Sequence, residues 1–183
     1  MHPINQHVFL ILLFPLILLL GCSENKNPVS PTPDSNILLN SSFEKNGNPA
    51  TDDWEISARP YGEITNDAPI GGGNYCLKLE ASNPGGMATR QFPAVSNKQI
   101  YKLSFWAKTN QPSSKAFFEL IRNGLVENQT ELSVIDTTWT EYSVTDTFQV
   151  MNGDSLRITF QERITQLQMF ESYFDLVKVE TVD

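Results

Sequence analysis

Histidine, the side chain most often used for acid–base catalysis, occurs only twice in this chain of 183 residues. Both copies, His2 and His7, precede an apolar run that we expect to be removed. Without histidine the mature chain would have no Ser-His-Asp triad, no Cys-His dyad and no His-ligated zinc or haem. Any catalysis would have to rest on carboxylates, Tyr, Lys or Arg.

Carboxylate pairs cleave glycosidic bonds in many enzymes, and Glu119, Glu162 and Glu171 are available here. Nothing in their spacing marks two of them as an acid and its partner base. A polysaccharide lyase built on Tyr, Lys or Arg has no sequence signal either, and one small domain seldom holds the deep cleft of a glycosidase. We therefore expect a protein that is not an enzyme.

The charge balance is acidic, with 13 Lys and Arg against 21 Asp and Glu and a formal net charge of −8. This charge repels the phosphates of nucleic acids and the headgroups of anionic lipids. We therefore expect no nucleic-acid partner, and membrane contact only through a lipid anchor.

The N-terminus has the features of a lipoprotein signal peptide. The apolar run Val8–Leu20 is shorter than the roughly 20 residues of a membrane-spanning helix and fits the apolar region of a signal peptide. The sequence LLGC at Leu19–Cys22 resembles the bacterial lipobox, which implies a signal peptide at residues 1–21 and fatty acylation, including palmitate, of Cys22. The alternative is an ordinary secretory signal followed by a chance cysteine. Ser23 resembles an outer-membrane sorting signal, so we expect anchorage to the bacterial envelope, at the outer membrane or cell surface.

Residues 22–36 would then form the lipidated cysteine and a flexible tether, because the segment contains three prolines and no aromatic residue. The folded domain is expected over residues 37–183. With Cys22 lipidated, Cys76 has no disulfide partner, and its alternating apolar surroundings favour a small buried side chain over a reactive thiol.

The domain shows a hydrophobic period of two. In residues 100–110, IYKLSFWAKTN, and in residues 155–163, SLRITFQER, apolar and polar side chains alternate, as they do in half-buried antiparallel strands. Similar runs occur at 37–44, 54–58, 61–66, 74–81, 86–95, 115–122, 129–135, 139–149 and 169–181. About ten short strands separated by polar turns predict an all-β fold, an antiparallel β-sandwich of the jelly-roll kind. We expect Trp54 and Trp139 in its core.

Several segments resemble carbohydrate-binding modules of families 4, 9 and 22, which share a galactose-binding-like jelly roll. The matching segments, in order, are Asn36–Glu44 with Trp54, Tyr75–Leu79, Tyr101–Lys108, Thr138–Tyr142 and Phe174–Val179. Cys76 and Leu176 depart from the family pattern, which often has Ser and a second acidic residue or Asn there. The resemblance implies a structural Ca²⁺ between the first and last strands, held by Glu44 and Asp175. The alternative is that both carboxylates are solvated at strand ends.

A sugar site needs an aromatic plane for the apolar face of a pyranose and polar groups that bond its hydroxyls. Trp106 is the first candidate because it lies on the polar face of its strand, although a covering loop would also explain it. We expect it to share one concave sheet with other candidates. The carbohydrate-binding candidates are Trp106, Arg90, Phe117, Glu119, Gln161 and Tyr61, with Arg163 and Tyr173 as further positions.

The expected function is therefore non-catalytic binding of a polysaccharide or oligosaccharide by a membrane-anchored lipoprotein. The alternative is a protein-interaction or adhesion module on the same fold, with envelope proteins as its partners.

Overall fold

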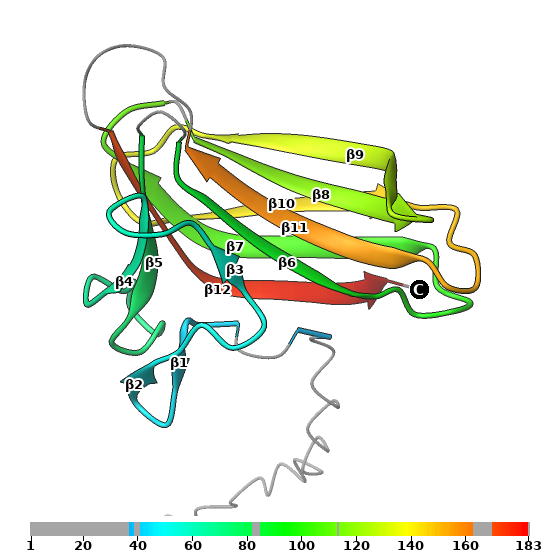
Figure 1. Cartoon of the computed structure of the whole chain (residues 1–183), viewed down its shortest axis with the longest axis horizontal. Coiled ribbons are helices and arrows are strands. Elements are labelled where there is room, and N and C mark those ends of the chain that lie inside the picture. The colour runs from blue at the N-terminus through cyan, green and yellow to red at the C-terminus, as the bar shows by residue number, and fades with distance from the viewer. Residues whose placement is uncertain (1–36, 39–40, 82–84, 113, 163–169, 183) are drawn as a thin grey trace, which may run out of the picture. The chain divides into compact units, whose positions relative to one another are not determined.

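Two five-stranded antiparallel sheets make up most of the domain in this computed structural model (Figure 1). The structure describes residues 37–38, 41–81, 85–112, 114–162 and 170–182, all within the unit Pro33–Asp183. The predicted signal peptide, lipidated cysteine and tether lie outside these residues, as does Arg163. No helix in the described part of the chain is long and apolar enough to span a bilayer.

The chain passes repeatedly from one sheet to the other. In chain order the strands are β1 (Glu44–Lys45), β2 (Asn48–Pro49), β3 (Glu55–Ile56), β4 (Gly62–Thr65), β5 (Cys76–Glu80), β6 (Met87–Pro93), β7 (Ile100–Thr109), β8 (Ser114–Arg122), β9 (Leu125–Val134), β10 (Thr140–Thr147), β11 (Ser155–Glu162) and β12 (Glu171–Val182). One sheet, the β7 sheet, has the order β10-β7-β12-β5-β4, and the other, the β11 sheet, has the order β3-β6-β11-β8-β9, with β4–β5 and β8–β9 as consecutive neighbours within one sheet. β1 and β2 form a separate two-stranded ribbon.

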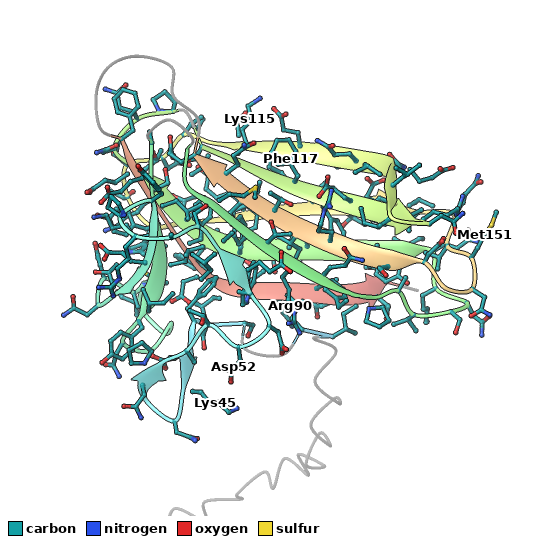
Figure 2. All side chains as sticks on the ribbon, in the orientation of Figure 1. Lys45, Asp52, Arg90, Lys115, Phe117 and Met151 are labelled. Carbon is teal, nitrogen blue, oxygen red and sulfur yellow. The ribbon has the colours of Figure 1, made fainter. Side chains whose placement is uncertain are left out.

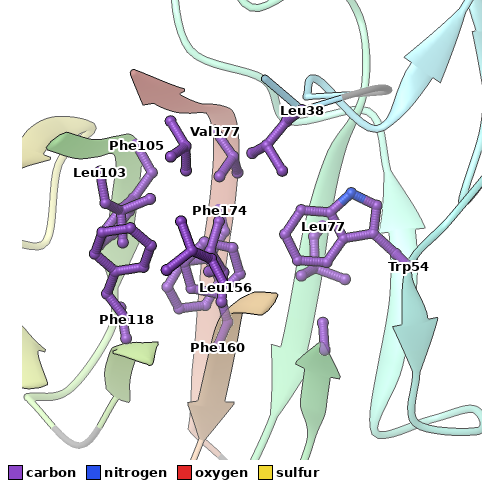
Figure 3. Close-up of a cluster of buried hydrophobic side chains, with 14 of the residues drawn as sticks. Leu38, Trp54, Leu77, Leu103, Phe105, Phe118, Leu156, Phe160, Phe174 and Val177 are labelled. Carbon is purple, nitrogen blue, oxygen red and sulfur yellow. The ribbon is translucent and has the colours of Figure 1, made fainter. Parts of the chain in front are cut away.

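Each sheet buries one face because its side chains alternate in polarity. Along β11, for example, Leu156, Ile158 and Phe160 are fully buried, whereas the residues between them are partly exposed. Phe160 lies at the centre of the core (Figure 3): its ring stacks on Phe174 of the other sheet at 4.3 Å and on Trp54 at 5.7 Å between ring centroids. The predicted β-sandwich and the core position of Trp54 are confirmed.

Two local predictions are wrong. The segment expected to be a strand over 37–44 contributes only Glu44 to β1, because Phe43 has a positive φ of 51° that breaks the extended backbone. The segment still borders β12, since the Ile37 amide donates to the Val179 carbonyl at 3.0 Å.

Trp139 precedes β10 and is partly exposed; its ring packs edge-on against Tyr173 and beside the Lys108 ammonium instead of in the core.

Candidate functional site

A shallow groove of about 400 Å³ crosses the outer face of the β11 sheet. Its central row is formed by residues in direct cross-strand register, namely Glu55 on β3, Thr89 on β6, Thr159 on β11 and Phe117 on β8. Because this row crosses four neighbouring strands, the groove runs across the sheet and not along a single strand. The remaining lining residues are Met87, Glu119, Gln129, Arg157 and Gln161.

The floor of the groove contains an aromatic ring and an ion pair. Phe117 is 7% exposed, so its ring forms a floor and does not project from the sheet. Beside it, the Arg157 guanidinium donates two hydrogen bonds to the Glu119 carboxylate, at 2.6 and 2.9 Å, and the Thr159 hydroxyl donates a third at 3.1 Å. The hydrogen bonds to Glu119 raise the pKa of Arg157 above its usual value. The two charges of this pair therefore compensate each other on the floor of the groove.

Three of the predicted sugar-binding residues line this groove, namely Phe117, Glu119 and Gln161. Trp106 does not join them. It lies on the outer face of the β7 sheet, because it is paired with Glu141 of β10 and Asp175 of β12. The expectation that Trp106 shares one concave sheet with Phe117, Glu119 and Gln161 is therefore wrong.

Arg90 and Tyr61 also lie outside the groove. Arg90 is in phase with buried Ala88 and Phe92 along β6, so its side chain lies on the inner face of the sheet, and its guanidinium pairs with the exposed Asp53 at 3.0 Å. Figure 2 shows Arg90 well separated from Phe117. Tyr61 precedes β4 at the edge of the β7 sheet, and its carbonyl accepts a hydrogen bond from the Glu80 amide at 3.0 Å.

Sequence reasoning missed the residues that complete the groove. The strand phase contained part of the signal, since Arg157 and Thr159 share a face with Gln161, and Thr89 shares one with Met87. The phase of each strand does not show that β6, β11 and β8 are neighbours in one sheet, and this pairing brings the faces together.

A second hollow, of about 310 Å³, lies on the outer face of the β7 sheet. We call it the Trp106 pocket. Its lining residues are Ser41, Ser104, Trp106, Glu141, Leu176, Val177 and Lys178. The groove and the Trp106 pocket therefore occupy opposite outer faces of the sandwich.

The predicted metal ligands Glu44 and Asp175 converge on the turn Gly71–Asn74. The Asn74 amide donates to Glu44 Oε2 at 2.8 Å, and added Cβ atoms at Gly72 and Gly73 would collide with the carboxylates of Asp175 and Glu44, respectively. Asp175 is fully buried, although it lies on the outward phase of β12, so this turn region covers it.

The Asp175 carboxylate is the feature most in need of a partner. Neither of its oxygens has a hydrogen-bond partner among the described residues. Burial raises the pKa of Asp175 to about 8; the nearby Leu176 backbone amide lowers it in part, and the Glu44 charge adds a smaller increase. A buried, unsatisfied carboxylate beside a second carboxylate is the environment that a hard cation such as Ca²⁺ would stabilise. The described residues contain no group of three or more His, Cys, Asp or Glu side chains around a common point, so backbone oxygens would have to complete such a site.

A family model described as "Carbohydrate binding domain" matches residues 35–166. Among solved structures, the enzymatically active domain of tailspike protein 4 from bacteriophage CBA120 superposes with a TM-score of 0.62 at 17% identity, covering 81% of this chain but only 22% of that one. TmCBM61, in complex with β-1,4-galactotriose, superposes with a TM-score of 0.56 at 14% identity, covering 80% and 99%.

The CBM22-1 xylan-binding domain from Paenibacillus barcinonensis superposes with a TM-score of 0.52 at 16% identity, covering 78% of this chain and 92% of that one. At these identities the likenesses show a common jelly-roll β-sandwich. No curated protein matches the sequence.

Proposed function

Because the chain belongs to the carbohydrate-binding domain family, we propose that it binds a saccharide chain in the groove of the β11 sheet. The observation that carries this proposal is the row from Glu55 through Thr159 to Phe117, which crosses four strands. In this row the Phe117 ring lies on the floor of the groove and polar side chains surround it. The apolar face of a pyranose packs on aromatic carbon, while carboxylate, amide and hydroxyl groups bond its hydroxyls in fixed directions.

The charges in the groove favour a neutral saccharide. The lining includes two carboxylates, Glu55 and Glu119, and one cation, Arg157. Since Arg157 is held by Glu119, the exposed carboxylate of Glu55 is uncompensated within the groove. A uronic-acid polymer would meet like charge there, whereas a neutral polymer would not.

The test is retardation of the full-length protein, kept in detergent, in native gels that contain soluble polysaccharides. Two structural relatives supply the first probes, since one was solved with β-1,4-galactotriose and the other is named as xylan-binding. We expect β-1,4-galactan, xylan or another neutral polymer to retard the protein, and polygalacturonate to leave its migration unchanged.

Gln129→Ala and Gln161→Ala should weaken this retardation without unfolding the domain, because both side chains lie at the surface of the groove. Gln91→Ala, an exposed change on β6 outside the groove, is the matched control. Free migration in every neutral polymer would contradict the proposal and favour the protein-interaction or adhesion module at the envelope.

We propose that the domain does not cleave the saccharide. Each carboxylate considered for catalysis already has a structural role: Glu119 is held by Arg157, Glu162 is fully buried among the Ser114 and Ser172 hydroxyls, and Glu171 pairs with Lys78 at 2.9 Å. A glycosidase needs one carboxyl group to donate a proton and another to attack or activate water. Release of reducing ends from a retained polymer would contradict this.

We further propose that Glu44 and Asp175 hold a structural Ca²⁺ with the backbone of the turn Gly71–Asn74. The partnerless oxygens of Asp175 and the close approach of both carboxylates to Gly72 and Gly73 support this assignment. Ca²⁺ takes six to eight oxygen ligands and would offset the repulsion between the two carboxylates. Its role would be to hold the start of β1, at Glu44, against β12.

The lipobox-like sequence at Leu19–Cys22 supports a lipid anchor, which would place the domain on the bacterial envelope. Mass spectrometry of the mature protein should find acyl chains on an N-terminal Cys22, and Cys22→Ala should release the protein from membranes. An unmodified Cys22 in membrane-derived protein would contradict the anchor.

A further inference from the structure

Trp106 is a partly exposed aromatic residue at the centre of a polar sheet face. Its neighbours in register are Glu141 on one side and Asp175 on the other, and Ser104 is the next outward residue on β7. An indole in this position leaves part of its apolar surface in water unless something covers it.

The strand beside Trp106 is distorted where it forms the pocket wall. Between the pairs Trp106–Asp175 and Ser104–Lys178, β12 contains one more residue than β7, which is a β-bulge. Leu176 in this bulge has a positive φ of 48°, an uncommon conformation for a non-glycine residue. Bulges and such backbone outliers are enriched at functional sites, where they redirect side chains.

Two polar groups beside the indole, the exposed Glu141 carboxylate and the Ser104 hydroxyl, make no hydrogen bond or ion pair among the described residues. Ser104 is 7% exposed, so its hydroxyl lies at the bottom of the pocket. Lys178 is already paired with Glu180 at 2.8 Å. The pocket therefore combines an aromatic plane, an acceptor and a hydroxyl without a free cation, which suits the hydroxyl groups of a neutral sugar and disfavours an anion.

We propose that the Trp106 pocket is a second saccharide site, which takes the apolar face of a neutral pyranose on the indole and its hydroxyls on Glu141 and Ser104. The inference rests on the proposed function, because it assumes the same class of ligand. Its volume of about 310 Å³ lies at the small end of ligand sites, so it fits one or two sugar units. With the groove on the opposite face, one domain would bridge two glycan chains.

The test is titration calorimetry of the full-length protein in detergent and saturating calcium. The probes are β-1,4-galactotriose, xylohexaose and cellohexaose, each used in turn. With a neutral oligosaccharide that binds, the wild-type protein should take two molecules. Trp106→Ala should remove one of them, while Trp106→Phe keeps a weaker site, with affinity reduced by about tenfold. Trp139→Phe, which changes a tryptophan outside the pocket, is the matched control and should leave both sites intact.

Variants of the groove separate this inference from the proposed function. Gln129→Ala combined with Gln161→Ala should weaken one site and leave the site that depends on Trp106 unchanged. A single site that needs the groove residues and ignores Trp106→Ala would overturn the second site alone. A single site lost in Trp106→Ala and unaffected by the groove variants would support this inference and overturn the groove. No heat with any probe would overturn both.

Discussion

The Arg157 guanidinium holds the Glu119 carboxylate through two hydrogen bonds, 2.6 and 2.9 Å long, on the floor of the groove. The Glu119 side chain is 7% exposed, so removal of its partner would leave a largely buried carboxylate without a compensating charge. Arg157→Met should lower the free energy of unfolding by about 2–3 kcal/mol in urea titrations at neutral pH.

The pair between Lys115 and Glu131 on the same sheet provides the control, because both side chains are about a third or more exposed. Lys115→Met should lower the free energy of unfolding by less than about 1 kcal/mol. Equal losses in the two variants would contradict a special role for the groove pair.

Calcium removal should lower the melting temperature of the protein. Without the ion, the buried Asp175 carboxylate has no partner among the described residues and lies near Glu44. We expect EDTA to lower the melting temperature by several degrees and added Ca²⁺ to restore it, whereas Asp175→Asn should respond to neither. An unchanged melting curve of the wild-type protein in EDTA would rule out the ion.

Two glycines in the same turn distinguish backbone strain from contact with the carboxylates. Gly71 and Gly73 have nearly the same φ, 87° and 84°, so alanine should cost about 1–2 kcal/mol at either position through the backbone alone. Only at Gly73 would the new methyl group also collide with Glu44, since nothing lies within 4 Å of a Cβ at Gly71. Gly73→Ala should therefore melt below Gly71→Ala and lose its response to Ca²⁺. Identical melting and Ca²⁺ responses would show that Glu44 does not lie against Gly73.

The thiol of Cys76 should be unreactive in the folded protein. Burial raises its pKa from 9.0 to about 12, so the folded chain holds the proton more tightly than the unfolded chain does. The corresponding stabilisation is fully present below pH 9.0 and is lost as the pH rises from there toward 12. Alkylation by iodoacetamide near pH 8, read at the Cys76 peptide by mass spectrometry, should be at least about a hundredfold slower than in urea. Equal rates would show that the thiol is exposed.

The fold could be predicted from the sequence because its main signal is local. Alternation along residues 100–110 and 155–163 places successive side chains on opposite faces of a strand, whichever strand lies beside it. The same alternation put Arg90 in phase with Ala88 and Phe92, so its inward orientation could have been recognised before its partner Asp53 was known.

The candidate sites could be predicted only in part. Phase alone shows that Phe117 and Glu119 share one face of β8 and that Trp106 and Ser104 share one face of β7. It does not show that these faces point away from each other, because that depends on which strands pair over long separations in sequence.

The strand pattern, the two carboxylates on the first and last strands and the aromatic side chains on polar faces were determined by the sequence itself. Pleating and charge are properties of each segment, so they can be read without knowledge of the segment's neighbours. The tertiary structure alone decided that Trp106 and Phe117 lie on opposite sheets and that the turn Gly71–Asn74 covers Asp175. Those placements come from hydrogen bonds and packing between distant segments, which no local pattern encodes.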